Sequence, residues 1–383
     1  MDVRVAATGG VRYGELWTLG IGDLMRAAAA DVLKNFDGDM KDIDTLVLSN
    51  CFAGRALGIH TLIPLAYDEL GFRGRIFEVT GSDATGGFAV QRAAILIESG
   101  VAQRVLVLGV EKIGDLLASQ VQSALSSLLG SEQVFQGQTL ASDYALMARQ
   151  YMETYGVTLR DLALISVKNH ANASLNPMAQ FPFPLTVEQA AESQEIASPL
   201  RALDAASICD GASALILEKP GKNSSPVSIV GLGEGRDLPG LHDRKDLTSL
   251  AATREAAQMA YEAAGVSPQE IDVAEVHDVY SIAELMAIED LGFARPGQAK
   301  TWVRKGRTAL GGDLPVNPSG GLKACGHAPG ATGVRQAAEI AVQLSASAGK
   351  RQVADASVGL SHSVGGNGSQ CAVTIFRTIA IRG

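Results

Sequence analysis

Residues 80–87 of this chain read Thr80-Gly81-Ser82-Asp83-Ala84-Thr85-Gly86-Gly87. The β-branched and aromatic run before them, residues 75–79, predicts a buried strand, and the apolar run after them, residues 88–97, predicts a packed helix. Small residues and two glycines at the junction let the backbone turn sharply and approach a neighbour closely. A side chain at such an elbow lies at a helix N-terminus, where free N–H groups and the helix dipole favour an anion. Because Asp83 stands at the tip, the elbow predicts a site with a carboxylate at its centre.

Composition narrows the class of protein. The chain has 383 residues and a net charge of −9, and no run of Lys and Arg stands out, which argues against nucleic acid as a partner. The sequence shows neither an apolar run of membrane-spanning length nor an N-terminal signal pattern, so we expect a cytoplasmic protein without membrane contact. The four cysteines are scattered and no cluster has metal-ligand spacing, so we predict no disulfide framework and no metal site.

The first half of the chain alternates between strand and helix patterns. Strands are expected at 3–10, 44–49, 75–79, 104–110 and 210–218, and helices at 21–35 and 88–97. This alternation predicts an α/β protein with a layered, largely parallel sheet. Residues 114–205 interrupt the pattern with helices expected at 119–129, 141–155 and 160–172. An insertion of this length predicts a lid or substrate-facing subdomain.

The second half repeats the first. Strands are expected at 227–231, 273–276 and 367–375, and helices at 250–265 and 331–346, in the same order as before. The Gly-rich turn after residues 314–317 resembles the elbow at Asp83. We therefore predict two similar halves, residues 1–220 and 221–383, with the boundary in the Pro- and Gly-containing segment 220–226.

Three further stretches combine glycines with a histidine. They are Val276-His277-Asp278-Val279-Tyr280, residues 317–333 around His327, and residues 360–368 around His362. Together with residues 109–112, 167–170, 175–177 and 210–214, they resemble the thiolase superfamily, and most closely its archaeal and sterol-carrier-type thiolases. The resemblance implies a five-layered αβαβα fold, a homodimer, and acyl-CoA substrates without a covalently bound cofactor. It also implies two candidate partners, a small OB-fold, zinc-ribbon protein and an enzyme related to HMG-CoA synthase.

The resemblance assigns roles to residues of this chain. Asp83 stands where such enzymes carry the nucleophilic cysteine, His327 matches the histidine that activates it, and His277 matches an oxyanion-hole residue. Gly365, through its N–H, matches part of the second oxyanion hole. Five more residues are expected to contact substrate or CoA: Asn317, Gly320, His170, Tyr280 and Ser363.

The thiols of ordinary thiolases are missing from their expected positions. Val279 and Ser363 stand where different members of the superfamily carry an acid/base cysteine, and Asp83 replaces the nucleophile. A carboxylate is a poor nucleophile toward a thioester, so we predict that Cys-dependent thiolysis and condensation are lost or altered. Asp83 could instead act as a base or orient His327, or it could only cap its helix, which contributes about 1 kcal/mol.

Three functions remain open at this point. The first is an acetyl-CoA acetyltransferase-like enzyme whose nucleophile has moved, with Cys325 as the candidate. The second is a Cys-independent retro-aldolase or decarboxylase of a CoA thioester that uses Asp83, His277, His327 and Tyr280. The third is a non-catalytic scaffold subunit of an acyl-CoA multienzyme complex.

Overall fold

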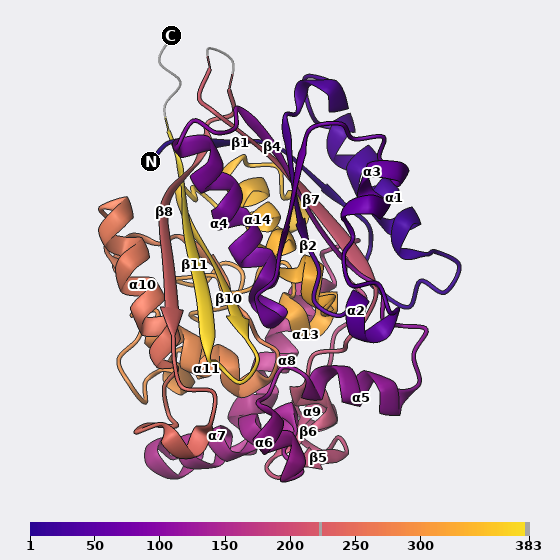
Figure 1. The fold of residues 1–383 in the computed structure, drawn as a ribbon. Helices are drawn as coiled ribbons and strands as arrows, with labels where there is room; N and C mark the ends of the chain where they lie inside the picture. Colours follow the sequence, from indigo (N-terminus) through magenta and orange to yellow (C-terminus); the bar gives the residue numbers. More distant parts are fainter. Residues whose placement is uncertain (222–223, 380–383) are drawn as a thin grey trace.

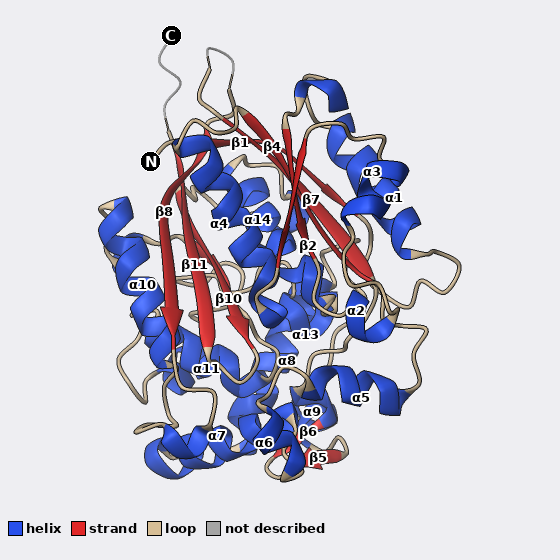
Figure 2. Ribbon diagram, in the orientation of Figure 1, coloured by secondary structure: helices blue, strands red, loops and turns tan. Residues whose placement is uncertain are grey.

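The strands of the first half form where β-branched runs predict them. The computed structural model describes residues 1–221 and 224–379, and Figures 1 and 2 show its elements. Five strands of this half lie side by side in the order β3-β2-β4-β7-β1. Their bounds are Arg75–Val79 (β3), Thr45–Ser49 (β2), Arg104–Glu111 (β4), Gly211–Glu218 (β7) and Val3–Gly10 (β1).

The second half forms the same arrangement, so the predicted pair of similar halves is confirmed. Its strands follow in the order β8-β11-β10-β9, and β1 pairs with β8 to make one sheet of nine strands. A parallel bridge from Ala274 to Val316 stands where the first half has its fifth strand. The bounds are Val227–Arg236 (β8), Gln370–Thr378 (β11), Val358–Gly365 (β10) and Val273–Glu275 (β9).

The expectation of a largely parallel sheet was wrong. Among the described strands of the nine-stranded sheet, β2–β3, β2–β4 and β9–β10 pair in parallel, and the other five pairings are antiparallel. In the first half, β4 leads into the inserted segment and β7 leaves it at the same end of the sheet, so β7 must run back (Figure 1). In the second half, the short turn between β10 and β11 forces an antiparallel hairpin.

Helices complete five layers. Two central helices, α4 (Thr85–Glu98) and α14 (Pro329–Leu344), pack against each other between the two half-sheets (Figure 1). The outer face of the first half-sheet is covered by α1 (Ile21–Lys34), and that of the second by α10 (Ala251–Ala264). A Cβ on Gly86 would lie 2.8 Å from the backbone nitrogen of Gly333, so α4 and α14 approach this closely only because both positions are glycine.

The inserted segment lies at one end of the sheets, at the bottom of Figure 1. The helices expected there are present, although the first ends earlier than predicted. They are α5 (Ala118–Ser126), α6 (Ser131–Phe135), α7 (Leu140–Tyr155), α8 (Leu159–Ala173) and α9 (Val187–Ala191), with a small hairpin of β5 (Glu195–Ala197) and β6 (Leu200–Arg201).

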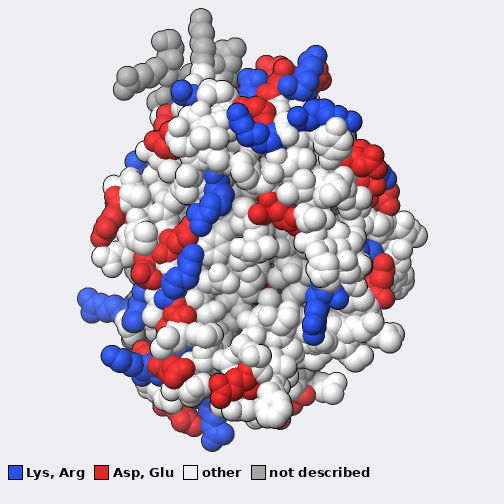
Figure 3. Space-filling view, viewed as in Figure 1, with Lys and Arg blue, Asp and Glu red and all other residues white. Residues whose placement is uncertain are grey.

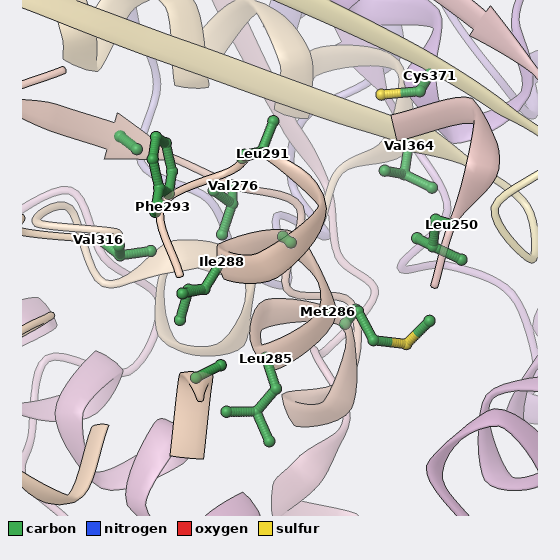
Figure 4. Packing of buried hydrophobic residues seen from close by; sticks show 14 of the residues in the cluster. Leu250, Val276, Leu285, Met286, Ile288, Leu291, Phe293, Val316, Val364 and Cys371 are labelled. Atoms are coloured by element: carbon green, nitrogen blue, oxygen red, sulfur yellow. The ribbon is translucent and has the colours of Figure 1, made fainter. Parts of the chain in front are cut away.

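A buried helix supports the strand ends of the second half. Helix α11 (Ser281–Asp290) is buried on nearly all sides, which is typical of a helix inside the core. Figure 4 shows its Leu285, Met286 and Ile288 among the side chains of one large cluster that also holds Val276 and Val364. This packing fixes the backbone of residues 276–280, the stretch that contains His277.

Two expectations fall partly outside what the structure describes. Lys222 and Asn223, within the predicted boundary segment, are outside the described residues, and the division at 220/221 stays a prediction. Among the helices in the described part of the chain, none combines the length and the apolar character that crossing a bilayer requires.

Candidate active site

The elbow after β3 is made by one 3₁₀ turn, Ser82–Ala84, that leads directly into α4. Ser82 has φ 55°, a left-handed conformation that non-glycine residues adopt rarely and that is often found at functional sites. The turn expected from small residues is made by Ser82. The close approach expected from the glycines is confirmed, because Gly86 and Gly87 lie inside α4 and pack against α14 and Ser363.

The structure brings three predicted catalytic side chains together. Asp83 Oδ2 lies 3.7 Å from Nε2 of His277 and 3.7 Å from Nε2 of His327. The two imidazole rings stand edge to face, with centroids 5.2 Å apart. Each of the three residues is about 1% exposed. They come from the elbow, from the end of β9 and from the start of α14, so the site lies where the two halves meet.

A backbone N–H holds one oxygen of Asp83. Oδ1 accepts a hydrogen bond of 2.5 Å from the N–H of Gly366 and one of 3.1 Å from the Ser82 hydroxyl. The N–H that reaches Asp83 therefore belongs to the neighbour of the predicted Gly365. Gly365 itself ends β10 opposite Gln370, and its assigned role stays a prediction.

Thr332 orients the ring of His327. Its hydroxyl donates to the carbonyl of Ala328 at 3.0 Å, so it accepts from Nδ1 of His327 at 2.8 Å. The proton of the neutral ring then sits on Nδ1, and Nε2 points a lone pair at Asp83. Burial lowers the pKa of His327 to about 4. Burial acts to raise the pKa of Asp83, but His277, whose Nε2 can carry a proton toward Oδ2, outweighs it and holds that pKa well below its usual range.

A second histidine supports His277 from behind. The backbone N–H of His277 donates to Nδ1 of His362 at 3.3 Å, and Nε2 of His362 bonds to the Thr253 hydroxyl at 3.0 Å. The preceding residue, Val276, donates its N–H to Oδ1 of Asn317 at 2.8 Å. Asn317, predicted to contact substrate, gives its Nδ2 to Glu284 and so has both ends of its side chain engaged within the protein.

The other predicted binding residues are spread around the site. Ser363 donates to Gln336 and packs against Gly87, between the two central helices. Gly320 contacts α8, where an added Cβ would lie 2.6 Å from Cβ of Ala173. Within the described part of the chain, no hydrogen bond joins Ser363 or Gly320 to the three central side chains.

The lid contributes a tyrosine and a histidine near the site. Tyr280, at the start of α11, stacks at 4.9 Å on Tyr144 of α7, whose hydroxyl donates to the carbonyl of Gly366 at 3.2 Å. Tyr144 links the lid to the loop that holds Asp83, and the sequence pattern gave no sign of it beyond its place in an expected helix. The ring of His170 packs against Phe181 and Phe183 and bonds to the carbonyl of Phe183.

Comparisons with known proteins agree with this architecture. Residues 5–220 match the family model described as the N-terminal domain of thiolase, and residues 233–378 match the one described as thiolase C-terminal domain-like. The chain belongs to the thiolase family.

Relatives within the thiolase family carry several names. The acetyl-CoA acetyltransferase of Methanothermobacter thermautotrophicus is 39% identical over 98% of this chain and 99% of its own length. Human sterol carrier protein 2 is 33% identical over 93% of this chain and 67% of its own length. Among solved structures, an Ltp2–ChsH2(DUF35) aldolase shares the fold with a TM-score of 0.85 and 23% identity, covering 100% of this chain and 98% of that one. An acetyl-CoA acetyltransferase from Syntrophomonas wolfei has a TM-score of 0.74 and 18% identity, covering 98% and 99%.

The thiols of this thiolase-family chain are poorly placed to act as nucleophiles. Cys325 donates its thiol to the carbonyl of Ser319 at 2.9 Å, and burial raises its pKa to about 11. Cys51 lies within electrostatic reach of Asp83. Burial raises the pKa of Cys51 well above its usual value, and the charges of Glu111 and Asp83 add to the rise. Because the thiolate is the reactive form, neither environment favours acyl transfer to cysteine.

Proposed function

We propose that this chain is a Cys-independent carbon–carbon lyase that cleaves a β-hydroxyacyl-CoA by a retro-aldol reaction. The observation that carries the proposal is the pair of acceptor atoms at the centre of the site, Asp83 Oδ2 and His327 Nε2, with His277 beside them. Members of the thiolase family act on CoA thioesters, which supplies the substrate class. One protein of the same fold is named an aldolase, so the fold is compatible with this reaction.

The reaction needs a base and an enolate-binding donor, and no acyl-enzyme. The base takes the proton of the β-hydroxyl group, and the electron pair of the O–H bond forms the new carbonyl as the Cα–Cβ bond breaks. The electrons of that bond move into the thioester as an enolate, which a hydrogen-bond donor stabilises. A proton delivered to Cα then gives the acyl-CoA. In this proposal Asp83 and His327 take the hydroxyl proton and return a proton to Cα, His277 holds the enolate oxygen, and Tyr280 is a second proton donor.

The ionised state of Asp83 favours retro-aldol cleavage over decarboxylation. A decarboxylase substrate brings its own carboxylate to the bond that breaks and needs no base for that step. Near the buried, ionised Asp83 such a carboxylate would be repelled, and the repulsion is strong where the effective dielectric is low. A neutral β-hydroxyl group meets no such penalty and gains an acceptor.

Hydrogen exchange tests the proposal without knowledge of the full substrate. Acetyl-CoA incubated with the chain in D₂O and EDTA should gain deuterium at its methyl group, because enolate formation is the reverse of the last step. Asp83→Asn should lower the exchange rate by about 100-fold or more, while Cys51→Ser and Cys325→Ser should leave it within about twofold. A covalent acetyl group on a cysteine would restore the acyltransferase hypothesis. Binding of acetyl-CoA without exchange would favour the scaffold.

We also infer two protein contacts for this chain. Strand β3 is at the edge of the sheet with Phe77 43% exposed, which suits pairing with the β3 of a second copy. The centre of the face in Figure 3 carries mostly uncharged side chains. On the lid, Leu117 and Phe135 are 71% and 92% exposed, and a small OB-fold, zinc-ribbon protein is the partner we propose there.

Each contact has its own test. Light scattering should give twice the chain mass for the wild type and the chain mass for Phe77→Asp; a monomeric wild type would contradict the dimer. Affinity purification from the source organism should recover the small partner with the wild type and lose it with Phe135→Asp; equal recovery would move the contact elsewhere. An enzyme related to HMG-CoA synthase stays a prediction from the resemblance.

A further inference from the structure

Two hydrogen-bond acceptors face each other at the centre of the site. Thr332 holds the ring proton of His327 on Nδ1, so Nε2 presents a lone pair to Asp83 Oδ2 at 3.7 Å. The other oxygen of Asp83 is engaged by Gly366, whereas Oδ2 and Nε2 have no hydrogen-bond partner among the described residues. Two acceptors in this arrangement repel unless a protic or positively charged group lies between them.

A third nitrogen is directed at the same point. His277 Nε2 also lies 3.7 Å from Asp83 Oδ2, and it too has no partner in the described part of the chain. The three atoms lie within 4.8 Å of one another, and all three residues are about 1% exposed. Imidazole nitrogen and carboxylate oxygen are ligands of first-row transition metals, and two histidines with one carboxylate form a recurrent set. We propose that Asp83, His277 and His327 bind one divalent transition-metal ion.

Two of the three ligand separations require only small adjustments, and the third, between the two imidazole nitrogens, is at most 4.8 Å. Metal–ligand bonds of about 2.0–2.2 Å at tetrahedral angles place neighbouring ligand atoms about 3.3–3.6 Å apart. The observed separations of 3.7 Å from Oδ2 to each nitrogen would therefore close by a few tenths of an ångström. Three protein ligands leave at least one coordination position for water or substrate, which is the pattern of catalytic rather than structural sites.

The groups behind the ligands are those that orient metal-binding side chains. Nδ1 of His327, the nitrogen away from Asp83, donates to Thr332. The Gly366 N–H binds Oδ1 of Asp83 and so leaves Oδ2 as the coordinating oxygen. His362 accepts from the backbone N–H of His277. Such outer contacts fix the ring orientation and the coordinating atom of a ligand. Ligand spacing in a sequence reveals metal sites whose ligands lie close together in the chain. The three ligands instead come from three distant segments, so their spacing could not show them.

Ion binding and the lyase proposal are separable. An ion would occupy the lone pairs that the lyase proposal assigns to proton transfer, so that proposal describes the ion-free site. The exchange experiment is therefore run in EDTA, and the binding experiment is run without substrate. Failure of one leaves the other intact.

The test is a titration of the chelator-treated full chain with Co²⁺ and Zn²⁺, followed by calorimetry and by visible absorption. The wild type should bind one ion per chain, with Co²⁺ bands of a low-symmetry site. Asp83→Asn keeps the shape of the side chain but should weaken binding by about 100-fold or more. His242 is exposed, pairs with Asp243 and is not one of the proposed ligands. His242→Gln is therefore the control and should bind the ion like the wild type.

A second variant guards against a fold that fails. Asp83→Cys exchanges an oxygen ligand for a thiolate, so it should keep one ion per chain and add a sulfur-to-cobalt charge-transfer band. Equal binding by the wild type and Asp83→Asn would overturn the proposal, as would loss of binding in His242→Gln. Failure of the wild type to bind either ion would also overturn the proposal. It would mean that a water molecule lies between Asp83 Oδ2 and His327 Nε2.

Discussion

The two halves of the molecule use the same elbow to different ends. In the first half, β3 passes through one 3₁₀ turn with Ser82 at φ 55° and enters α4 at once. In the second half, the bridge residue Val316 is followed by Asn317 at φ 56°, and a short helix, α13 (Gly321–Cys325), precedes α14. Both elbows thus depend on a non-glycine residue in the left-handed region.

The difference lies in how each elbow delivers its functional side chain. Asp83 is at the tip of a tight turn and is held by a backbone N–H from the β10–β11 loop. His327 comes after the longer detour and is held by a side chain of its own helix, Thr332. A backbone anchor is independent of side-chain substitution, whereas a side-chain anchor can be removed by one. Asp83 should therefore be the more robustly placed of the two.

The largest expected effect concerns the contact that both halves share. A Cβ on Gly333 would lie 2.1 Å from the backbone nitrogen of Gly87 and 2.6 Å from the carbonyl carbon of Gly86. Because backbone meets backbone there, Gly333→Ala should lower the free energy of unfolding by about 3 kcal/mol or more, or prevent folding. Urea denaturation measures it.

Two matched variants sharpen this prediction. Gly86→Ala meets α14 at 2.8 Å, a less severe overlap, and should destabilise less than Gly333→Ala. Gly54, in the short helix α2 (Ala53–Ala56), has its nearest neighbour at 3.4 Å, so Gly54→Ala should be neutral or stabilising by up to about 1 kcal/mol. A Gly333→Ala protein as stable as the wild type would mean that the two central helices can move apart.

A smaller effect is expected when the anchor of His327 is removed. Thr332→Val keeps the volume but leaves Nδ1 without its acceptor, so the ring can place its proton on Nε2, toward Asp83. The maximal rate of deuterium exchange should fall about 10–100-fold with an unchanged KM for acetyl-CoA. Thr332→Ser, which restores a hydroxyl group, should recover most of the rate. A change in KM alone, or no rescue by serine, would show that Thr332 serves packing only.

Local patterns predicted most of the fold and only part of the site. Alternating strands and helices, and their repetition, were enough to predict the two halves, because each element is specified by its own residues. Strand direction could not be predicted in this way. The direction of β7 depends on the end of the sheet at which the inserted segment leads back into it. Asp83, His277 and His327 stood out through their glycine-rich surroundings. Tyr144 and Gly366 did not, because their contacts join segments far apart in the chain.

The smallest expected effect tests the histidine behind His277. His362 is buried and neutral, and burial lowers its pKa to about 3, below the ordinary value of about 6.5. Between these two values the unfolded chain binds a proton that the folded chain does not, so acid withdraws stability from the wild type by about 1.4 kcal/mol per pH unit through this residue. Glutamine at this position has no proton to gain and can still accept from the N–H of His277. We expect His362→Gln to be less stable than the wild type at pH 7. Because only the wild type loses stability through this position in acid, the difference in free energy of unfolding, measured by urea denaturation, should be smaller at pH 5 by about 2 kcal/mol. For the exposed control His242→Gln, the difference in free energy of unfolding from the wild type should be the same at both pH values. If the difference for His362→Gln is also the same at both pH values, His362 is already protonated, or hydrated, in the folded chain.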